Sequence, residues 1–338
     1  MKKYTFTIVS VMILLLFVCC NRKNNIKEVS SFPIFSSIKV KHKLAIDSAL
    51  TTYPVMKIDG NYCCIADMAS KNVFFHLYSY PSFKYIKSFG KIGRGPNELA
   101  MLTSFDFRNG VVSALCGADR TIKLFDCENP STPTIIRPKE IHDYSSICDG
   151  GDKTFYLYSL DGKNRIHRID MFGRVISKGL KAEALKKEYP RMTSNYIWQG
   201  RIRKNGNYIV VPTACGDIID ISNRELETSI RIKGELGAPQ VKEKVTSNSK
   251  SYILQYQTYV DAVLSKQIYA LFLCEDLSKY PNGKKRNSIR VFDYLGNPQK
   301  ELMLEKDLEA SSFYVDEENR KIYIVVPESE KPIWVYEL

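Results

Sequence analysis

The sequence lacks the spacings on which several large protein classes depend. It contains no Gly-x-Ser-x-Gly, no Walker spacing and no Gly-x-Gly-x-x-Gly between a strand and a helix, which argues against an α/β-hydrolase and a nucleotide site. Helix-turn-helix, RNP and Cys/His finger patterns are also missing. Although Lys and Arg number 49 against 37 Asp and Glu, we therefore expect no nucleic-acid partner.

Cysteine is present, but not in a pattern that builds a site. None of the nine cysteines has Cys-x-x-Cys spacing, and seven of them, an odd number, follow the first twenty residues. This argues against a disulfide framework and a zinc finger. Most lie inside apolar runs such as 62–65 and 271–274, so we expect free thiols that fill small spaces in the core.

The N-terminus carries a secretory signal. Lys2 and Lys3 precede an apolar stretch of eleven residues, Ile8–Val18, which is shorter than the roughly twenty residues that span a bilayer core of about 30 Å. Cys19 and Cys20 follow directly, with no small-x-small cleavage site. An apolar core that ends at a cysteine is typical of a bacterial lipobox.

We predict lipid attachment at Cys20, because Cys19 supplies the small residue that the signal peptidase needs just before the modified cysteine. Cys19 itself is the alternative, and an uncleaved anchor with an incidental cysteine pair is a further one. The predicted divisions are a lipoprotein signal peptide over residues 1–19, a membrane tether over 20–37 and a folded domain over 38–338.

These features predict a lipid-anchored protein of the bacterial cell envelope. Residues 21–23, Asn-Arg-Lys, are basic rather than acidic, which favours the outer membrane with the protein facing the periplasm. Removing Lys2 and Lys3 lowers the formal charge from +12 to +10. A charge of this size attracts anionic lipid or polysaccharide, although the cations are dispersed along the chain.

The rest of the chain is predicted to be all-β. Short apolar strands separated by Gly, Asn, Asp and Pro recur along the chain. One kind of apolar strand, which we call the marker strand, returns roughly every 35 to 50 residues, a spacing typical of propellers. The six markers are residues 73–78, 121–126, 164–170, 217–221, 288–293 and 331–336. Polar turns before Tyr-Ile-Val, at 205–211 and 318–325, indicate inner hairpins. Six units of four strands predict a single six-bladed β-propeller.

Because the chain stops soon after the sixth marker, the last blade needs a strand from the N-terminus, and Ile38 to Ile46 is well placed to supply it. Two segments, Ala182 to Tyr189 and Ala238 to Gln257, are the only ones with a helical pattern.

The most unusual local sequence is the segment 88–99, which we call the glycine loop. Gly90, Gly93 and Gly95 permit tight backbone turns, Pro96 fixes one φ, and Glu98 can accept hydrogen bonds from exposed amides. The loop either shapes a binding face, with Arg94 and Glu98 as candidate contacts, or simply links the first two blades. We predict the first.

The loop resembles the Gly-x-Gly-Pro-Gly-Glu sequence of six-bladed propeller lipoproteins of the TolB-like and NHL-like group, with Asn97 in place of the third glycine. The lipobox, the Phe292–Gly296 hairpin and the chain length agree with this group. The resemblance spans about residues 38–338. It implies the fold and the envelope location, but no established activity and no cofactor.

Catalytic chemistry finds little support in the sequence. Six-bladed lactonases hold a metal in the central channel with acidic and amide side chains, and the candidates here are Asp106, Asp119, Asp149, Asp217 and Asp316. Aspartates at blade starts also cap turns, and we favour that role. The four histidines, His42, His76, His142 and His167, lie on separate units without pairing. We therefore assign no metal site.

A better surface candidate is the segment 195–204. Tyr196 and Trp198 beside Arg201 and Arg203 suit the stacking of a sugar ring or the grip of an anionic partner. The alternative, which we favour, is a strand of blade four with Ile197 and Ile202 in the core and the cations in solvent.

Together these features predict a membrane-anchored propeller that binds a protein or glycan of the envelope, without catalysis. The alternative is a metal-dependent hydrolase or lactonase with its site in the central channel. The channel lining discriminates between them. Several carboxylates and amides around one point would favour the enzyme, and a mixture of apolar and basic side chains would favour the binding module.

Overall fold

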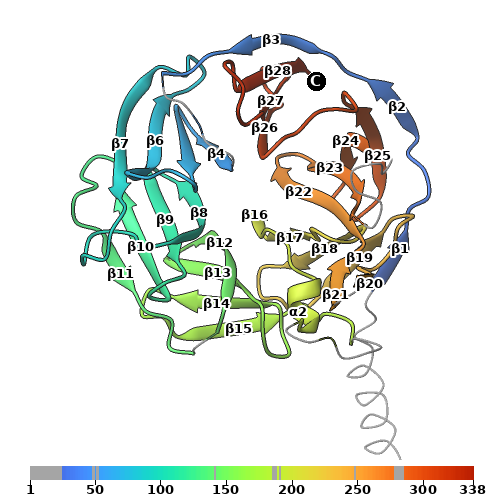
Figure 1. Ribbon diagram of the computed structural model, residues 1–338, viewed down its shortest axis with the longest axis horizontal. Coiled ribbons are helices and arrows are strands. Elements are labelled where there is room, and N and C mark those ends of the chain that lie inside the picture. The colour runs from blue at the N-terminus through green and yellow to red at the C-terminus, as the bar shows by residue number, and fades with distance from the viewer. Residues whose placement is uncertain are drawn as a thin grey trace, which may run out of the picture.

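Strands that are apolar on both faces require sheets that are covered on both sides, and the computed structural model has this arrangement. It describes residues 25–47, 50, 53–140, 142–184, 189, 192–246, 249–277 and 285–338. Six sheets stand around a central axis as propeller blades (Figure 1). The second strand of a blade, such as β13 (Thr154–Ser159), is buried throughout because neighbouring blades pack on both its faces. The predicted six-bladed propeller is confirmed.

Each blade is built from four antiparallel strands, and the first strand lies nearest the axis (Figure 1). Blades one to three comprise β4 (Pro54–Asp59), β5 (Tyr62–Asp67), β6 (Val73–Ser79), β7 (Tyr85–Lys91); β8 (Leu102–Arg108), β9 (Val111–Cys116), β10 (Thr121–Asp126), β11 (Thr134–Ile136); and β12 (Tyr144–Gly151), β13, β14 (Ile166–Asp170), β15 (Val175–Gly179).

Blades four to six comprise β16 (Arg203–Asn205), β17 (Tyr208–Pro212), β18 (Ile218–Asn223), β19 (Ser229–Lys233); β22 (Tyr256–Leu264), β23 (Ile268–Asp276), β24 (Arg286–Phe292), β25 (Pro298–Met303); and β26 (Ser312–Asp316), β27 (Lys321–Val325), β28 (Ile333–Glu337) with β3 (Val40–Leu44). The six marker strands of the sequence are the third strands of the blades. The two predicted inner hairpins are β16–β17 and β26–β27.

The ring is closed by the N-terminal strand, as predicted. β3 is the outermost strand of blade six and pairs antiparallel with β28, with Leu44 opposite Ile333 and His42 opposite Val335. The last blade therefore combines strands from the two ends of the described chain, which removes an open edge.

The chain from β1 (Asn25–Glu28) to β3 runs along the outside of the ring, and we call these residues, 25–44, the N-terminal belt (Figure 1). β1 adds a fifth, parallel strand to blade four beside β19, and β2 (Ile34–Ser37) does the same in blade five beside β25. The prediction that residues 20–37 are a tether is therefore wrong for residues 25–37, because their backbone pairs with the blades. The predicted signal peptide, Cys19 and Cys20 lie outside the described residues.

The helical predictions are not supported. Ala238 to Gln257 holds an antiparallel hairpin, β20 (Val241–Thr246) with β21 (Ser249–Leu254), followed by the start of β22. Residues 182–184 are irregular and Tyr189 forms only an isolated bridge to Met192, while 185–188 lie outside the described residues. One short helix, α2 (Ser194–Ile197), is capped at Thr193. No helix within the described ranges is long and apolar enough to cross a membrane.

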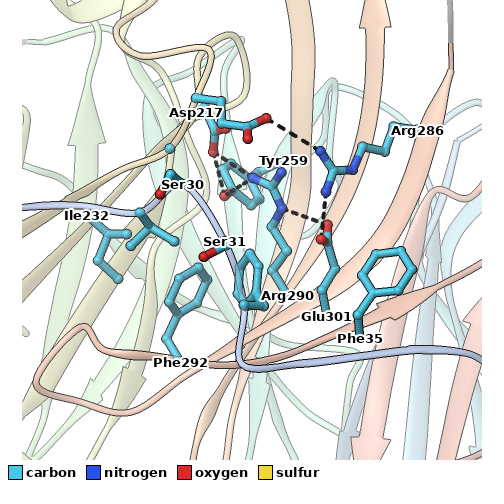
Figure 2. A pocket seen from close by; sticks show the side chains of 14 residues that line it. Ser30, Ser31, Phe35, Asp217, Ile232, Tyr259, Arg286, Arg290, Phe292 and Glu301 are labelled. Carbon is cyan, nitrogen blue, oxygen red and sulfur yellow. Dashed lines mark hydrogen bonds and ion pairs between the residues drawn. The ribbon is translucent and has the colours of Figure 1, made fainter.

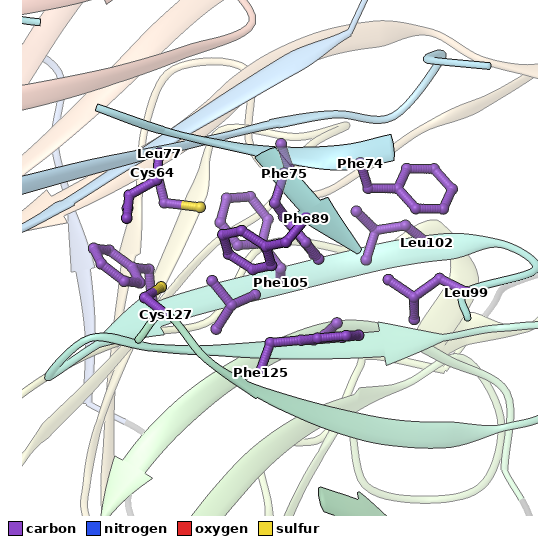
Figure 3. Packing of buried hydrophobic residues seen from close by; sticks show 14 of the residues in the cluster. Cys64, Phe74, Phe75, Leu77, Phe89, Leu99, Leu102, Phe105, Phe125 and Cys127 are labelled. Atoms are coloured by element: carbon purple, nitrogen blue, oxygen red, sulfur yellow. The ribbon is translucent and has the colours of Figure 1, made fainter. Parts of the chain in front are cut away.

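The core consists of aromatic and aliphatic layers between adjacent blades, and the layer between blades one and two is shown in Figure 3. Phe75 of β6 lies 5.3 Å from Phe89 and 5.5 Å from Phe105, measured between ring centroids. Cys64 and Cys127 fill small spaces in the same layer. The seven cysteines beyond residue 20 are free, and six of them are buried, which confirms the prediction of thiols in the core.

Every first strand starts on the same side of the ring, and we call this side the mouth face. The antiparallel order within each blade brings the connections between blades to this face. The glycine loop, α2 and the β20–β21 hairpin therefore all lie on the mouth face, because each precedes the first strand of the next blade.

Candidate functional site

The larger of two described cavities opens on the mouth face, at the end of the central channel. It has a volume of about 780 Å³, and we call it the channel mouth. Residues from all six blades line it: apolar Val55, Met68, Val260, Leu273 and Leu308, polar Thr103, Ser145, Gln199 and Asn287, and charged Arg201, Lys285, Glu275 and Glu309 are among them. The lining is thus a mixture of apolar and charged side chains.

Behind the channel mouth lies a cluster of buried charges centred on Asp261 of β22. The Asp261 carboxylate is 3.2 Å from Nη1 of Arg201 and 3.7 Å from Nζ of Lys57, and it also accepts a hydrogen bond from Arg203. The Asp261 side chain is 2% exposed. Because three cations share this carboxylate, with Asp106 acting on Lys57 from farther away, the cluster carries an excess positive charge.

The pKa values of the cluster reflect this crowding. Burial lowers the pKa of Lys57 to about 8, and the positive charge of Arg203 adds to the effect. Burial alone would raise the pKa of Asp261, but Arg203, Lys57 and Arg201 outweigh it and hold this pKa well below its ordinary value. Asp261 therefore stays ionised at neutral pH, and the site keeps its cationic character.

Arg201 is the member of this cluster that solvent reaches. Its side chain is 34% exposed and lines the channel mouth, while Asp261 contacts it from behind. A guanidinium held in this way presents a preorganised fork of donors to a carboxylate, sulfate or phosphate. The geometry suits an acidic group that enters the mouth from solvent.

The other residues predicted with Arg201 are arranged differently. Tyr196, on α2, is 37% exposed. Trp198 is 2% exposed and packs with Ile197 and Ile218, with the guanidinium of Arg231 4.5 Å from its ring centroid. The prediction that Trp198 stacks a ligand is therefore wrong, because its faces are already covered. The strand expected here begins only at Arg203, whose side chain is buried against Asp261 rather than in solvent.

The glycine loop links blades one and two and lies on the mouth face, outside the lining of the channel mouth. Arg94 is exposed. Glu98 accepts a hydrogen bond from Gly95 N at 2.9 Å and lies 2.9 Å from Lys91 Nζ, and these two contacts lower its pKa. The buried ammonium of Lys123 donates to the Pro96 and Glu98 carbonyls. Glu98 thus stabilises the loop from within.

The glycines of this loop are required for different structural reasons, which a Cβ atom placed at each position reveals. Gly90 has a φ of +74°, and a Cβ there would lie 2.5 Å from the Phe75 ring. A Cβ on Gly93 would lie 1.9 Å from the Glu98 carboxylate. Gly95, by contrast, has no positive φ, and within the glycine loop only Gly90 has the left-handed conformation.

The five predicted channel aspartates do not converge on one point. Asp119, Asp149 and Asp316 cap turns by accepting hydrogen bonds from Thr121, Gly151 and Asn319. Asp106 accepts a hydrogen bond from the backbone of Asp149 at 2.8 Å and so joins blades two and three. These contacts agree with the structural role favoured from the sequence.

The fifth, Asp217, lies in a second cavity of about 190 Å³ that the N-terminal belt covers (Figure 2). Arg290 of β24 donates to Asp217 at 2.8 Å and to Glu301 at 3.1 Å, and it stacks on Phe272 at 3.6 Å. Tyr259 donates to Asp217 at 2.9 Å. These contacts join blades four and five beneath the belt, and the polar groups are largely occupied by one another.

Sequence reasoning missed Lys57 and Asp261. A signal was available, since each is a single charge inside an otherwise apolar strand, 54–58 and 259–264. A charged residue at such a position is expensive to bury and so usually has a partner of opposite charge. The pairing itself is set by the ring, which brings β4 and β22 together across the axis.

The family model described as TolB-like 6-blade propeller-like matches residues 34–318 of the sequence. The chain belongs to this family. No curated protein matches it. The match begins at the first residue of β2, so it includes β2 and β3 of the N-terminal belt.

Solved structures similar to this TolB-like propeller agree on the fold. A candidate exported protein from Bacteroides fragilis is 12% identical with a TM-score of 0.54, covering 92% of this chain and 97% of its own. A member of the DUF4221 family from Bacteroides vulgatus is 11% identical with a TM-score of 0.51, covering 89% and 97%. At these identities the likeness extends to the propeller alone.

Proposed function

We propose that this TolB-like propeller is an exported, lipid-anchored binding module that captures an acidic group of an envelope protein or glycan at the channel mouth. The observation that carries the proposal is the convergence of Arg201, Arg203 and Lys57 on one carboxylate beneath an open cavity. The excess positive charge favours an anion, and the apolar lining around it favours a partner with carbon surface beside the acidic group.

Export and anchoring rest on the sequence. A basic start, an eleven-residue apolar stretch and two cysteines precede the first described strand. Two or three acyl chains on Cys20 would hold the protein firmly, whereas one chain gives only marginal binding. A position at the outer membrane, facing the periplasm, follows from the basic residues 21–23.

A metal-dependent hydrolase in the channel is the weaker proposal. It requires several carboxylate and amide ligands around one point, and the five candidate aspartates are engaged in turns, between blades or with Arg290, as described above. Glu275 and Glu309 at the channel mouth lie 3.9 and 3.8 Å from the ammonium of Lys285. The lysine side chain therefore supplies these two carboxylates with a positive charge, in the place that a metal ion would take.

The test compares two arginine variants of the full chain in detergent. Arg201→Gln removes the accessible guanidinium, and Arg174→Gln is the matched control, since Arg174 is exposed in the β14–β15 turn. Fluorescence anisotropy measures binding of a polyglutamate peptide, an oligogalacturonate and neutral dextran. We expect one acidic probe to bind with about tenfold or greater loss in Arg201→Gln only, weakening with added salt. The proposal would be overturned if Arg201→Gln and Arg174→Gln bound the acidic probe equally well. It would also be overturned if neutral dextran bound as tightly as the acidic probes.

A further inference from the structure

Two histidines that are far apart in the sequence meet at the mouth-face end of blade three. His142 lies in the connection before β12, and His167 lies near the start of β14. Their ring centroids are 4.7 Å apart. Glu140 completes the group, and one ligand atom from each of the three residues lies within 4.8 Å of the others. The view that the histidines are unpaired, taken from the sequence, is wrong for these two.

The orientation of His142 matches that of a metal ligand. Its Nδ1 lies 2.7 Å from the Asp161 carboxylate, which leaves Nε2 directed at Glu140 Oε2 at 3.5 Å. Metal-binding histidines commonly donate their second ring N–H to a carboxylate in this way. Two ligands of a tetrahedral zinc ion with bonds of about 2.1 Å are roughly 3.4 Å apart, so this pair is already close to the required spacing.

His167 offers a second nitrogen from the protein side. Its side chain is buried, and its Nδ1 lies 3.2 Å from the Tyr144 hydroxyl, so Nε2 is the nitrogen available to an ion.

A cation already approaches this group. Lys178, opposite His167 on β15, places its ammonium against Glu140. The Lys178 side chain is 36% exposed and the Glu140 side chain 41%, so the ammonium can withdraw into solvent when a smaller, doubly charged ion enters. Lys178 thus acts as a competitor whose removal has a predictable effect.

We propose that Glu140, His142 and His167 form a binding site for a divalent transition-metal ion of the zinc type, with Asp161 orienting His142. Two imidazoles and one carboxylate suit zinc, cobalt or copper and not magnesium or calcium, which prefer oxygen ligands. The three ligands leave a coordination position open to solvent. The site lies at the mouth-face end of blade three, where β14 begins.

The experiment uses the full chain in detergent, stripped of metal with a chelator and titrated with zinc by calorimetry. Wild type should bind, and Glu140→Gln and His142→Gln should each weaken binding about tenfold or more. His42→Gln and His76→Gln are the matched controls and should leave affinity unchanged. Lys178→Met should strengthen binding several-fold. All variants keep every native cysteine, including the seven free ones beyond residue 20, so any thiol contribution is the same in each variant.

Cobalt titrations provide a second readout, because a visible spectrum without thiolate charge-transfer absorption identifies nitrogen and oxygen ligands. Thermal unfolding without metal verifies that Glu140→Gln and His142→Gln remain folded. Equal zinc affinity in His142→Gln and His42→Gln, or no gain in Lys178→Met, would overturn the proposal. So would a cobalt spectrum dominated by thiolate absorption that persists in both ligand variants.

Discussion

Lys43 of β3 lies on the indole of Trp334 in β28, with its Nζ 3.5 Å from the ring centroid. The two residues are paired in the register of blade six and come from opposite ends of the chain. On either side of this contact, Val40 and Leu44 pack into the core layers of blade six. The closing strand therefore contributes apolar contacts as well as backbone hydrogen bonds to the ring.

Deleting residues 38–46 should destabilise the entire propeller. The deletion removes four partly buried aliphatic residues, Ile38, Val40, Leu44 and Ile46, each worth about 1 kcal/mol, and it opens the edge of β28. We expect the free energy of unfolding, measured by urea denaturation, to fall by about 4 kcal/mol or more. Lys41→Ala is the control, because the Lys41–Glu337 ion pair is exposed. An unchanged unfolding midpoint after the deletion would contradict closure by β3.

The buried charges predict a distinctive response to alkaline pH. The folded-state pKa of Lys57, about 8, lies below its ordinary 10.5, so the unfolded chain binds more protons between these two pH values. The stability contributed by this group must then rise as the pH increases from 8 to 10.5, by about 3 kcal/mol. Wild type should gain this amount relative to Lys57→Met. Parallel stability curves for the two proteins would contradict the buried position of Lys57.

Removing the carboxylate of the same cluster should lower the free energy of unfolding. Asp261→Asn leaves Arg203 and Lys57 without their shared counter-charge, and breaking a buried pair in this way costs about 3–5 kcal/mol. Arg201→Gln, whose side chain is partly exposed, should cost much less. Chemical unfolding at pH 7 compares the two. A loss in Arg201→Gln as large as that in Asp261→Asn would show that the charges are not organised around Asp261.

The glycine loop predicts different outcomes for two similar substitutions. Gly90→Ala forces a Cβ into the Phe75 ring at a positive φ and should cost about 2 kcal/mol or more. Gly95→Ala places its Cβ 3.0 Å from the Glu98 carboxylate, without a positive φ, and should cost clearly less. Urea midpoints measured side by side test this difference. The reverse order would mean that Gly95, and not Gly90, carries the strained backbone.

The lipid anchor is tested by two cysteine variants. Cys20→Ala should abolish labelling with an alkyne fatty acid and release the protein from the membrane fraction. Cys19→Ala should keep most of the labelling and most of the protein in the membrane fraction. If acylation disappears only in Cys19→Ala, the modified residue is Cys19. If membrane attachment is unchanged in both variants, neither cysteine is the lipid anchor and the lipoprotein prediction is wrong.

The fold could be predicted because each blade repeats the same local chemistry. Third strands such as 121–126 and 288–293 combine alternating apolar residues with a turn that requires Gly, Asn or Asp, and these are short-range signals. The closing strand could be predicted from the number of marker strands, because the sixth blade lacks a fourth strand after its marker. β1 and β2 were missed because most of their side chains are exposed, so pairing through the backbone leaves almost no apolar pattern in the sequence.

The errors at the mouth face have a common origin in long-range contacts. Residues 238–257 carry Lys, Glu and Gln, which favour helices, yet Val241 and Leu254 pair in a hairpin and pack near Trp198. That packing also hides Trp198 from solvent. His142 and His167, and likewise Lys57 and Asp261, are brought together only by the geometry of blades, which spacing along the chain does not encode.

The N-terminal belt also determines how an anchored propeller can stand on a bilayer. The first described strand, β1, lies at the periphery of blade four, and only residues 21–24 separate it from Cys20. Five residue steps extend about 18 Å at most, so a lipid on Cys20, if attached as predicted, would hold the outer edge of blade four next to the headgroups. A disc fastened at one point of its circumference can tilt about that point, which moves blade one, on the opposite side of the ring, farthest. In such an anchored protein the channel axis would be free to swing about blade four.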